Sequence, residues 1–144
     1  MKFDKARSAG FLANHMARLF AKGLQQSIRP LGLAPAQFMT LLELWGEDGL
    51  TQRQLVERLD VEQATMANTL TRMERDGLIE RRPHPGDGRS HSIHLTPKAI
   101  ALRQPATDAA RGVNAVALGG LSEAERLAFL DLTLRVVGSL KQRY

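Results

Sequence analysis

An asparagine and an arginine one helical turn apart, Asn68 and Arg72, carry groups that can hydrogen-bond to the edges of DNA bases. The amide of asparagine matches adenine, and the guanidinium of arginine matches guanine. In the same segment Met66, Leu70 and Met73 have the spacing of a buried helical stripe. A helix that turns by about 100° per residue places a polar face opposite this stripe. This face and its flank comprise Ala64, Thr65, Asn68, Thr71, Arg72 and Arg75.

A further arginine, Arg89, stands in a segment rich in turn-forming residues. Residues 78–82 and the alternating segment 91–95 each predict a strand, and residues 83–90 between them contain two prolines and two glycines. An arginine near the tip of such a hairpin is well placed to reach an anionic partner. Asp87 can hold Arg89 by a short ion pair or serve only as a turn residue.

Each of these features has a simpler interpretation. Polar helix faces are common where a helix meets solvent, and a surface loop can carry an arginine without any function. The order of the elements favours the functional interpretation, because two helices joined at Asp60-Val61 and followed by a hairpin outline a winged helix-turn-helix. In such a motif the second helix enters the major groove of DNA.

Local signals predict where the helices begin and end. Thr51 and Gln54 form a capping box that opens a short helix, and Ser122 with Glu125 forms another that opens the last helix. Gly77 is a suitable left-handed cap after the helix that ends at Asp76. Thr96-Pro97 predicts a further helix start. We therefore expect a mainly α fold with a small β-hairpin wing, in one domain over residues 1–144.

The ends of the chain carry apolar stripes that exceed what one small lobe can cover. Residues 5–29 have a 4-3-4 apolar spacing, and residues 122–141 have a 3-4-3 spacing. We expect residues 35–96 to form the DNA-binding lobe, and residues 5–29 and 97–141 to form dimerisation helices. Pro105 predicts a kink or break in the helix that runs from 97 to about 118.

Composition limits the possible functions. The chain has 144 residues, no cysteine and a formal charge of +5, which favours an acidic partner and excludes disulfides and cysteine-based metal or redox sites. Residues 51–96 are neutral, with seven arginines against seven acidic residues, so the placement of individual arginines matters more than net charge. We expect a cytoplasmic protein with no membrane span, because no apolar stretch approaches ~20 residues and no signal peptide is evident.

Three histidines, at positions 84, 91 and 94, could suggest a metal site, but their spacing along the chain does not favour one. His91 and His94 lie three apart on a predicted strand and so point to opposite faces, and His84 adds no complete ligand shell. No zinc-protease, phosphate-loop, dinucleotide or nucleophile-elbow motif occurs. We expect no metal, no cofactor and no enzymatic activity.

Taken together, the chain resembles the MarR family of regulators over essentially its whole length. The strongest match is 87–89, Asp-Gly-Arg, followed after five residues by Leu95-Thr96, which is similar to the wing signature of the family. Residues 77–81 resemble the junction before the wing, and 31–38 and 50–52 resemble the segments that enter the second and third helices. Ala99 departs from the family, in which many members have glycine.

The resemblance implies a homodimer that binds a pseudo-palindromic operator in double-stranded DNA, with one helix in the major groove and the wing arginine in the minor groove. By this resemblance, Ala64, Thr65, Asn68 and Arg72 would face the DNA bases. Arg89 would be the wing arginine that enters the minor groove. The full set that we expect to bind DNA is Ala64, Thr65, Asn68, Thr69, Arg72, Arg75, Asp87 and Arg89.

The resemblance also implies a site for a small anionic aromatic ligand between the dimerisation helices and the DNA-binding lobes. Asn14, His15 and Arg18 are candidates, since a histidine and an arginine can hold a carboxylate. Ion pairs between subunits, or solvated side chains, are the alternative. For the chain as a whole we expect a DNA-binding regulator that acts as a repressor. The alternative is a winged-helix protein-interaction module that does not bind DNA.

Overall fold

The computed structural model describes residues 1–84 and 86–144, with the side chains of residues 87–89 outside the description. Six α-helices, two short 3₁₀ turns and three strands follow one another along this part of the chain. The helices are α1 (Ala9–Ile28), α2 (Pro35–Gly46), α3 (Gln52–Leu59), α4 (Gln63–Arg75), α5 (Pro97–Ala117) and α6 (Glu123–Arg143). The strands are β1 (Leu50–Thr51), β2 (Ile79–His84) and β3 (Asp87–Leu95), and the turns are η1 (Lys5–Arg7) and η2 (Arg29–Leu31).

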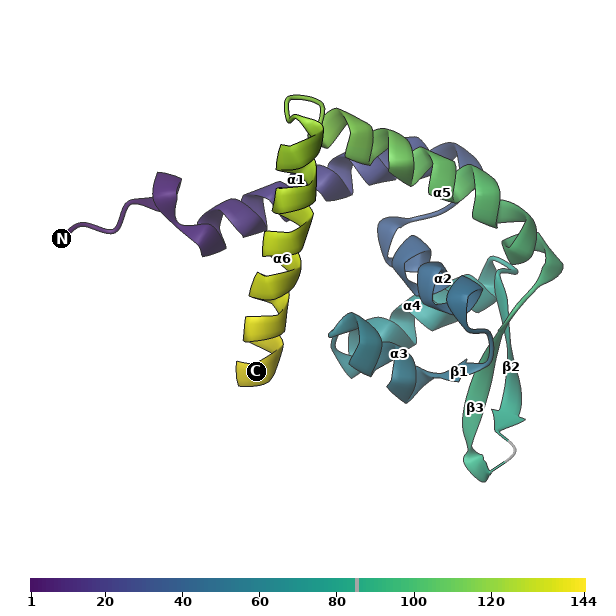
Figure 1. Cartoon of the computed structure of the whole chain (residues 1–144). Coiled ribbons are helices and arrows are strands. Elements are labelled where there is room, and N and C mark those ends of the chain that lie inside the picture. The colour runs from purple at the N-terminus through teal and green to yellow at the C-terminus, as the bar shows by residue number, and fades with distance from the viewer. Residues whose placement is uncertain (85) are drawn as a thin grey trace.

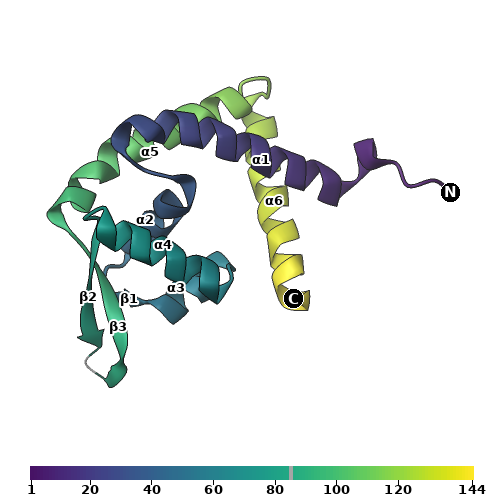
Figure 2. The ribbon, with the colours of Figure 1, turned by 180° about the vertical axis from the view of Figure 1, so that it is seen from behind.

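Residues 35–96 form a lobe of three helices and a small sheet, and α1 and α5 lie side by side across one end of it (Figures 1 and 2). We call residues 35–96 the lobe and the hairpin of β2 and β3 the wing. After α5 the chain turns back, and α6 runs away from α5 along the side of the lobe (Figure 1). The mainly α fold with a β-hairpin wing is confirmed.

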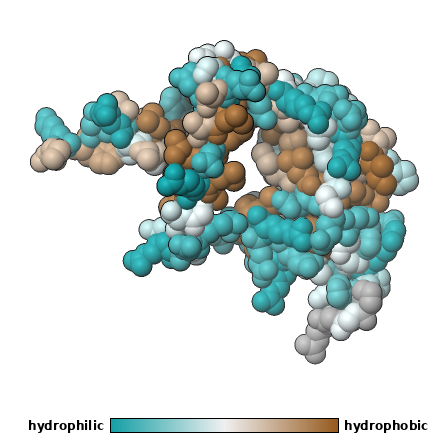
Figure 3. Space-filling model, viewed as in Figure 1, coloured by the Kyte–Doolittle hydropathy of each residue, from teal (hydrophilic) through white to brown (hydrophobic). Residues whose placement is uncertain are grey.

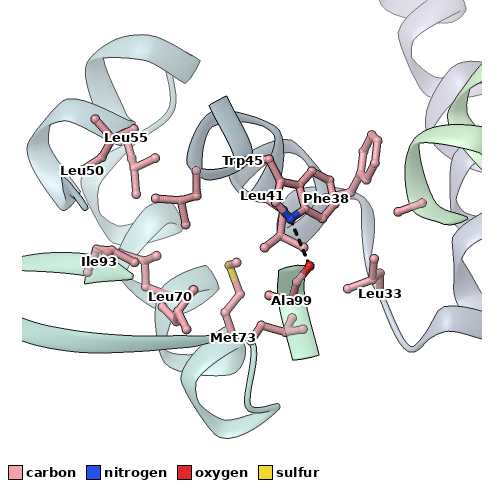
Figure 4. Close-up of a cluster of buried hydrophobic side chains, with 14 of the residues drawn as sticks. Leu33, Phe38, Leu41, Trp45, Leu50, Leu55, Leu70, Met73, Ile93 and Ala99 are labelled. Atoms are coloured by element: carbon pink, nitrogen blue, oxygen red, sulfur yellow. Dashed lines mark hydrogen bonds between the residues drawn. The ribbon is translucent and has the colours of Figure 1, made fainter. Parts of the chain in front are cut away.

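One hydrophobic core holds the lobe together and joins it to α5. Leu41, Leu70 and Ile93, from α2, α4 and β3, are all 0% exposed. At the edge of this core the indole nitrogen of Trp45 donates to the carbonyl oxygen of Ala99 at 3.0 Å (Figure 4). A buried indole N–H is costly without a partner, so this bond ties α2 to the first turn of α5.

The capping residues predicted at four helix ends are confirmed. The hydroxyl of Thr51 accepts from the backbone of Gln54 at 3.2 Å, while the Gln54 side chain accepts from the Thr51 backbone at 2.9 Å. Ser122 forms the same reciprocal box, and Thr96 caps α5. Gly77 has a φ of 73°, a left-handed conformation that glycine adopts without strain.

The structure differs from the sequence expectations at four places. The wing strands were predicted at residues 78–82 and 91–95 but run over Ile79–His84 and Asp87–Leu95. A third strand, β1, pairs with β3, so that the order in the sheet is β1-β3-β2. The first helix begins at Ala9 instead of residue 5, after the turn η1. Pro105 does not break α5, which continues to Ala117. Fully buried Ala99 and Ala106 anchor α5 against the lobe on either side of Pro105, and this packing offsets the lost backbone hydrogen bond.

Much of the apolar surface of α1 and α6 has no cover within the chain. Leu19 is 55% exposed on α1, and Leu130 and Leu134 are 50% and 70% exposed on α6. Figure 3 shows apolar surface on both sides of the hollow between α6 and the lobe. None of the helices in the described part of the chain is long and apolar enough to cross a membrane.

Candidate DNA-binding surface

The helix α4 presents the polar face that the sequence predicts. Met66, Leu70 and Met73 are at most 2% exposed and fix the inward side of the helix. The residues that the sequence places on this face are all exposed: Ala64, Thr65, Asn68, Thr71, Arg72 and Arg75; Gln63 and Glu74 are exposed as well. The helix therefore begins with a glutamine followed by two small side chains, and it carries an amide in the middle and two guanidinium groups toward its end.

Thr69 does not belong to this face, and its assignment as a DNA contact is wrong in this structure. Its exposed fraction is 8%, and its hydroxyl donates to the carbonyl oxygen of Thr65 at 2.9 Å. Because a helical threonine can satisfy its hydroxyl on the preceding turn, Thr69 fits into the apolar side of α4 next to Leu70.

The two arginines of α4 differ in their surroundings. The Nε of Arg75 donates to an Asp76 carboxylate oxygen at 3.1 Å, and its Nη2 lies 3.4 Å from the other oxygen. Hydrogen bonds from Arg75 and then Gln37 lower the pKa of the Asp76 carboxyl. Arg72 has no ion pair with any residue that the structure describes. Arg72 is thus the freer of the two cations for an external partner.

Asp76 also anchors the end of α4 to the rest of the molecule, a role that the sequence analysis missed. The buried side chain of Gln37, on α2, donates to Asp76 at 3.0 Å and accepts from the backbone of Ala34 at 3.0 Å. The ammonium of Lys98, on α5, donates to the Asp76 carbonyl at 2.8 Å. Two elements, α2 and α5, therefore fix the direction in which α4 points.

The base of the wing is held by a second polar network. The carboxylate of Asp48 accepts from the backbone of Leu95 at 2.9 Å, and its other oxygen lies 3.6 Å from Nδ1 of His94. The other ring nitrogen of His94 lies 2.8 Å from the hydroxyl of Ser92. Gly49 has a φ of 81°, and a Cβ there would lie 3.1 Å from the His94 ring. The network positions the wing strands against the turn before β1.

His84 and His91 belong to the two wing strands, β2 and β3. No group of three or more metal-ligating residues occurs among the residues described. The side chains of Asp87 and Arg89, both predicted to contact DNA, lie outside the described residues, although their backbone belongs to β3.

Comparison with known proteins identifies the family. The model of the MarR family matches residues 31–90. A regulator of organic hydroperoxide resistance from Bacillus subtilis is 33% identical over 110 residues, which cover 74% of this chain and 75% of that protein. The chain belongs to the MarR family of transcriptional regulators.

Other MarR-type proteins match over most of the chain. The transcriptional repressor NicR from Pseudomonas putida is 28% identical over 137 residues, which cover 95% of this chain and 87% of NicR. BpsR from Bordetella bronchiseptica, whose DNA binding is regulated by 6-hydroxynicotinic acid, has a solved structure with a TM-score of 0.87 and 25% identity. That match covers 95% of this chain and 98% of the BpsR chain.

This MarR-family chain also has an apolar cleft of about 530 Å³ between α1, α2 and α5. Phe20 and Phe38 line it from α1 and α2, and Arg111 and Asn114 line it from α5. Arg111 is the only charged residue among the described residues of its lining, and its guanidinium donates to Asp108 at 2.7 Å. The cleft lies where α1 and α5 meet the lobe, and it is lined by residues that the sequence analysis did not name.

The three predicted ligand residues lie within about one turn of α1, and only His15 lines one of the two clefts beside this helix. His15 lines a second cleft, of about 850 Å³, between α1 and the end of α5. Asn14 and Arg18 line neither of these two clefts, and the Asn14 amide donates to the carbonyl of Gly10 at 2.7 Å. The sequence did carry a signal for Arg111. It stands among small and apolar residues, next to Ala110 and near Val113, where a charged side chain is unusual in a packed helix.

Proposed function

We propose that this MarR-family regulator is a homodimeric, sequence-specific repressor that acts in the cytoplasm and leaves its operator when a small anionic aromatic ligand binds. The observation that carries DNA recognition is the exposed face of α4, in which Asn68 and the unpaired Arg72 stand one turn apart beside the wing. Selection of bound sequences from random duplex DNA, read with and without candidate aromatic acids, is the direct test. An inverted repeat that the acid weakens is the expected result.

The composition of the α4 face argues against the alternative, a protein-interaction module. The centre of a protein–protein interface is rich in aromatic and other apolar side chains and poor in charged ones. The exposed side of α4 has no apolar side chain larger than Ala64, and two arginines stand on it. Major-groove recognition fits this composition better, because small residues let the helix approach the bases.

Dimerisation is supported by the uncovered apolar surface of the terminal helices. The α6 helix has no buried residue within the described chain, although leucines and valines recur along it. Twofold pairing with a second copy buries such a surface on both subunits at once. The two copies of α4 then face the same side of the DNA, which requires an inverted repeat.

The wing arginine gives the first prediction. Arg89→Ala should weaken operator binding roughly tenfold per half-site, because a hydrogen bond to a charged group contributes about 1.5–3 kcal/mol. It should also lower the slope of log affinity against log salt by roughly one counterion per subunit. Fluorescence anisotropy across a salt series measures both effects. Unchanged affinity at moderate salt would remove Arg89 from the DNA interface.

For the effector we propose the cleft between α1, α2 and α5 rather than the surroundings of His15 and Arg18. An aromatic acid can place its ring between Phe20 and Phe38 and its carboxylate on Arg111, which has a single partner, Asp108, among the described residues. The similarity to BpsR, which is regulated by 6-hydroxynicotinic acid, supports a ligand of this class.

The second prediction separates the two possible ligand sites. Calorimetry with salicylate and 6-hydroxynicotinic acid should show that Arg111→Ala weakens binding at least tenfold, while Arg18→Ala binds as the wild type does. Loss of the carboxylate partner accounts for this difference. The reverse pattern would place the ligand beside Arg18, and equal binding by both variants would reject both sites.

The ligand response is not a thiol switch. The Bacillus subtilis relative is named for organic hydroperoxide resistance, whereas this chain contains no cysteine. A hydroperoxide therefore has no thiolate to oxidise here. We propose that the ligand acts instead by favouring a dimer in which the two α4 helices are wrongly spaced for the operator.

A further inference from the structure

A hydrogen bond between two glutamines crosses the helix-turn-helix. Gln52 is the first residue of α3, and Gln63 is the first residue of α4. The side-chain nitrogen of Gln52 lies 3.4 Å from the side-chain oxygen of Gln63 and donates to it. Gln63 is exposed and Gln52 is half-buried, so this pair joins the starts of the two helices at the surface of the molecule.

The positions of the pair match two different parts of a DNA site. In a helix-turn-helix, residues at the start of the second helix contact base edges, while the first helix crosses the sugar-phosphate backbone. Ala64 and Thr65 follow Gln63, so Gln63 is the longest side chain among the first three residues of α4. It therefore reaches furthest into a groove that this end of α4 enters.

The neighbouring polar side chains of α3 form hydrogen bonds or ion pairs with other residues. The amide oxygen of Gln54 accepts from the backbone of Thr51 at 2.9 Å in the capping box. The guanidinium of Arg53 pairs with Glu57 at 3.2 Å on the outer side of α3. Gln52 and Gln63 are left to bond with each other.

We propose that Gln63 is a further base-reading residue that recognises adenine, and that Gln52 is the positioning residue that holds its amide in the reading orientation. This inference rests on the proposed DNA-binding function. The oxygen of Gln63 has two lone pairs, one of which accepts from Gln52, so the second can accept from N6 of adenine. The nitrogen of Gln63 is then free to donate to N7 of the same base.

Base recognition by Gln63 depends on Gln52 as well, because Gln52 orients the Gln63 amide. A glutamine side chain has several rotatable bonds, and a base contact requires one rotamer. The bond from Gln52 fixes which end of the amide is the acceptor before DNA arrives. Loss of Gln52 should therefore weaken the same base preference that loss of Gln63 abolishes.

The test starts from the sequence that the wild type selects from random duplex DNA. Affinities of the wild type, Gln63→Ala, Gln52→Ala and the double variant are then measured on that operator and on operators with single base-pair changes. Gln63→Ala should lose roughly tenfold or more of its preference at one A·T pair in each half-site. Gln52→Ala should lose part of this preference at the same pair, and the double variant no more than Gln63→Ala.

Two further probes sharpen the assignment to adenine. Replacing that base with 7-deazaadenine should weaken the wild type and leave Gln63→Ala unaffected, because the modified base lacks N7. Gln63→Glu should shift the preference toward cytosine, since a carboxylate can only accept hydrogen bonds. Arg53→Ala is the matched control and should keep the base preference. Gln63 and Arg53 are exposed and Gln52 is half-buried, so unchanged thermal unfolding is required to confirm the fold of each variant.

The outcomes distinguish this inference from the function on which it rests. If the wild type selects no sequence, both are overturned. If the wild type selects an operator but Gln63→Ala keeps every base preference, the adenine assignment is wrong and the proposed function stands. If Gln63→Ala loses a preference but the effects of the two single variants add fully in the double variant, the positioning role of Gln52 is wrong.

Discussion

Replacing Arg72 with alanine should lower operator affinity roughly 10–100-fold per half-site, because a bidentate contact to a base contributes about 1–3 kcal/mol of discrimination. Most of this loss should fall at one base pair, since the guanidinium of Arg72 has no competing ion pair among the described residues. Asn68→Ala, one turn earlier, should relax a different base pair. Binding titrations on the operator and on its single base-pair variants measure both the position and the size of the effect.

Arg75→Ala provides the matched control for Arg72→Ala. Both arginines are exposed on α4, but the Arg75 guanidinium already contacts the Asp76 carboxylate through two nitrogens. We expect the control to weaken binding less than Arg72→Ala does, because the Arg75 guanidinium is shared with Asp76 and is less available to DNA. If Arg72→Ala weakens binding equally for all DNA sequences, Arg72 contacts only the backbone and the assignment of base recognition is wrong.

The features that were predictable from the sequence depend on contacts between near neighbours. The reciprocal bonds of Thr51 with Gln54 span three residues, and so do those of Ser122 with Glu125. The left-handed conformation of Gly77 is likewise a local preference. Because each of these signals acts within one helical turn, no knowledge of the tertiary fold is needed to recognise it.

The features that escaped prediction depend on residues far apart in the chain. Gln37 and Asp76 are 39 positions apart, and nothing local marks either as half of a pair. The strand β1 has only two residues, and it exists because Leu50 and Thr51 pair with Ile93 and Ser92. A two-residue strand has no periodicity of its own, so its partner strand must be known first.

Thr69 shows a limit of the helical-wheel argument within a correctly predicted helix. Met66, Leu70 and Met73 indicate the centre of the buried side but not its width. The buried side is wide enough to include Thr69, which is 8% exposed. The polar side chain of threonine suggested exposure, but burial is possible because its hydroxyl donates to the carbonyl of Thr65 within the same helix.

Glutamate at both Leu130 and Leu134 should convert the protein to a monomer and reduce operator affinity more than 100-fold. These leucines are 50% and 70% exposed in the single chain, and Val137 on the same face is 44% exposed. Two charges on each copy make burial of this face against a second copy costly. Neither leucine is expected to touch DNA, so the loss comes from breaking the link between two half-site contacts, which strengthens binding by about 10²–10⁴.

Gln142→Glu is the matched control for this variant, because it adds a charge to an exposed position near the end of α6 without touching the leucine face. Sedimentation at micromolar concentration should show a dimer for the wild type and the control, and a monomer for the double variant. A dimer fixes the operator as well, since two α4 helices related by a twofold axis need inverted half-sites about one helical turn apart, roughly 10 bp between centres. A wild type that sediments as a monomer and still binds the full operator tightly would contradict the dimer and this operator geometry together.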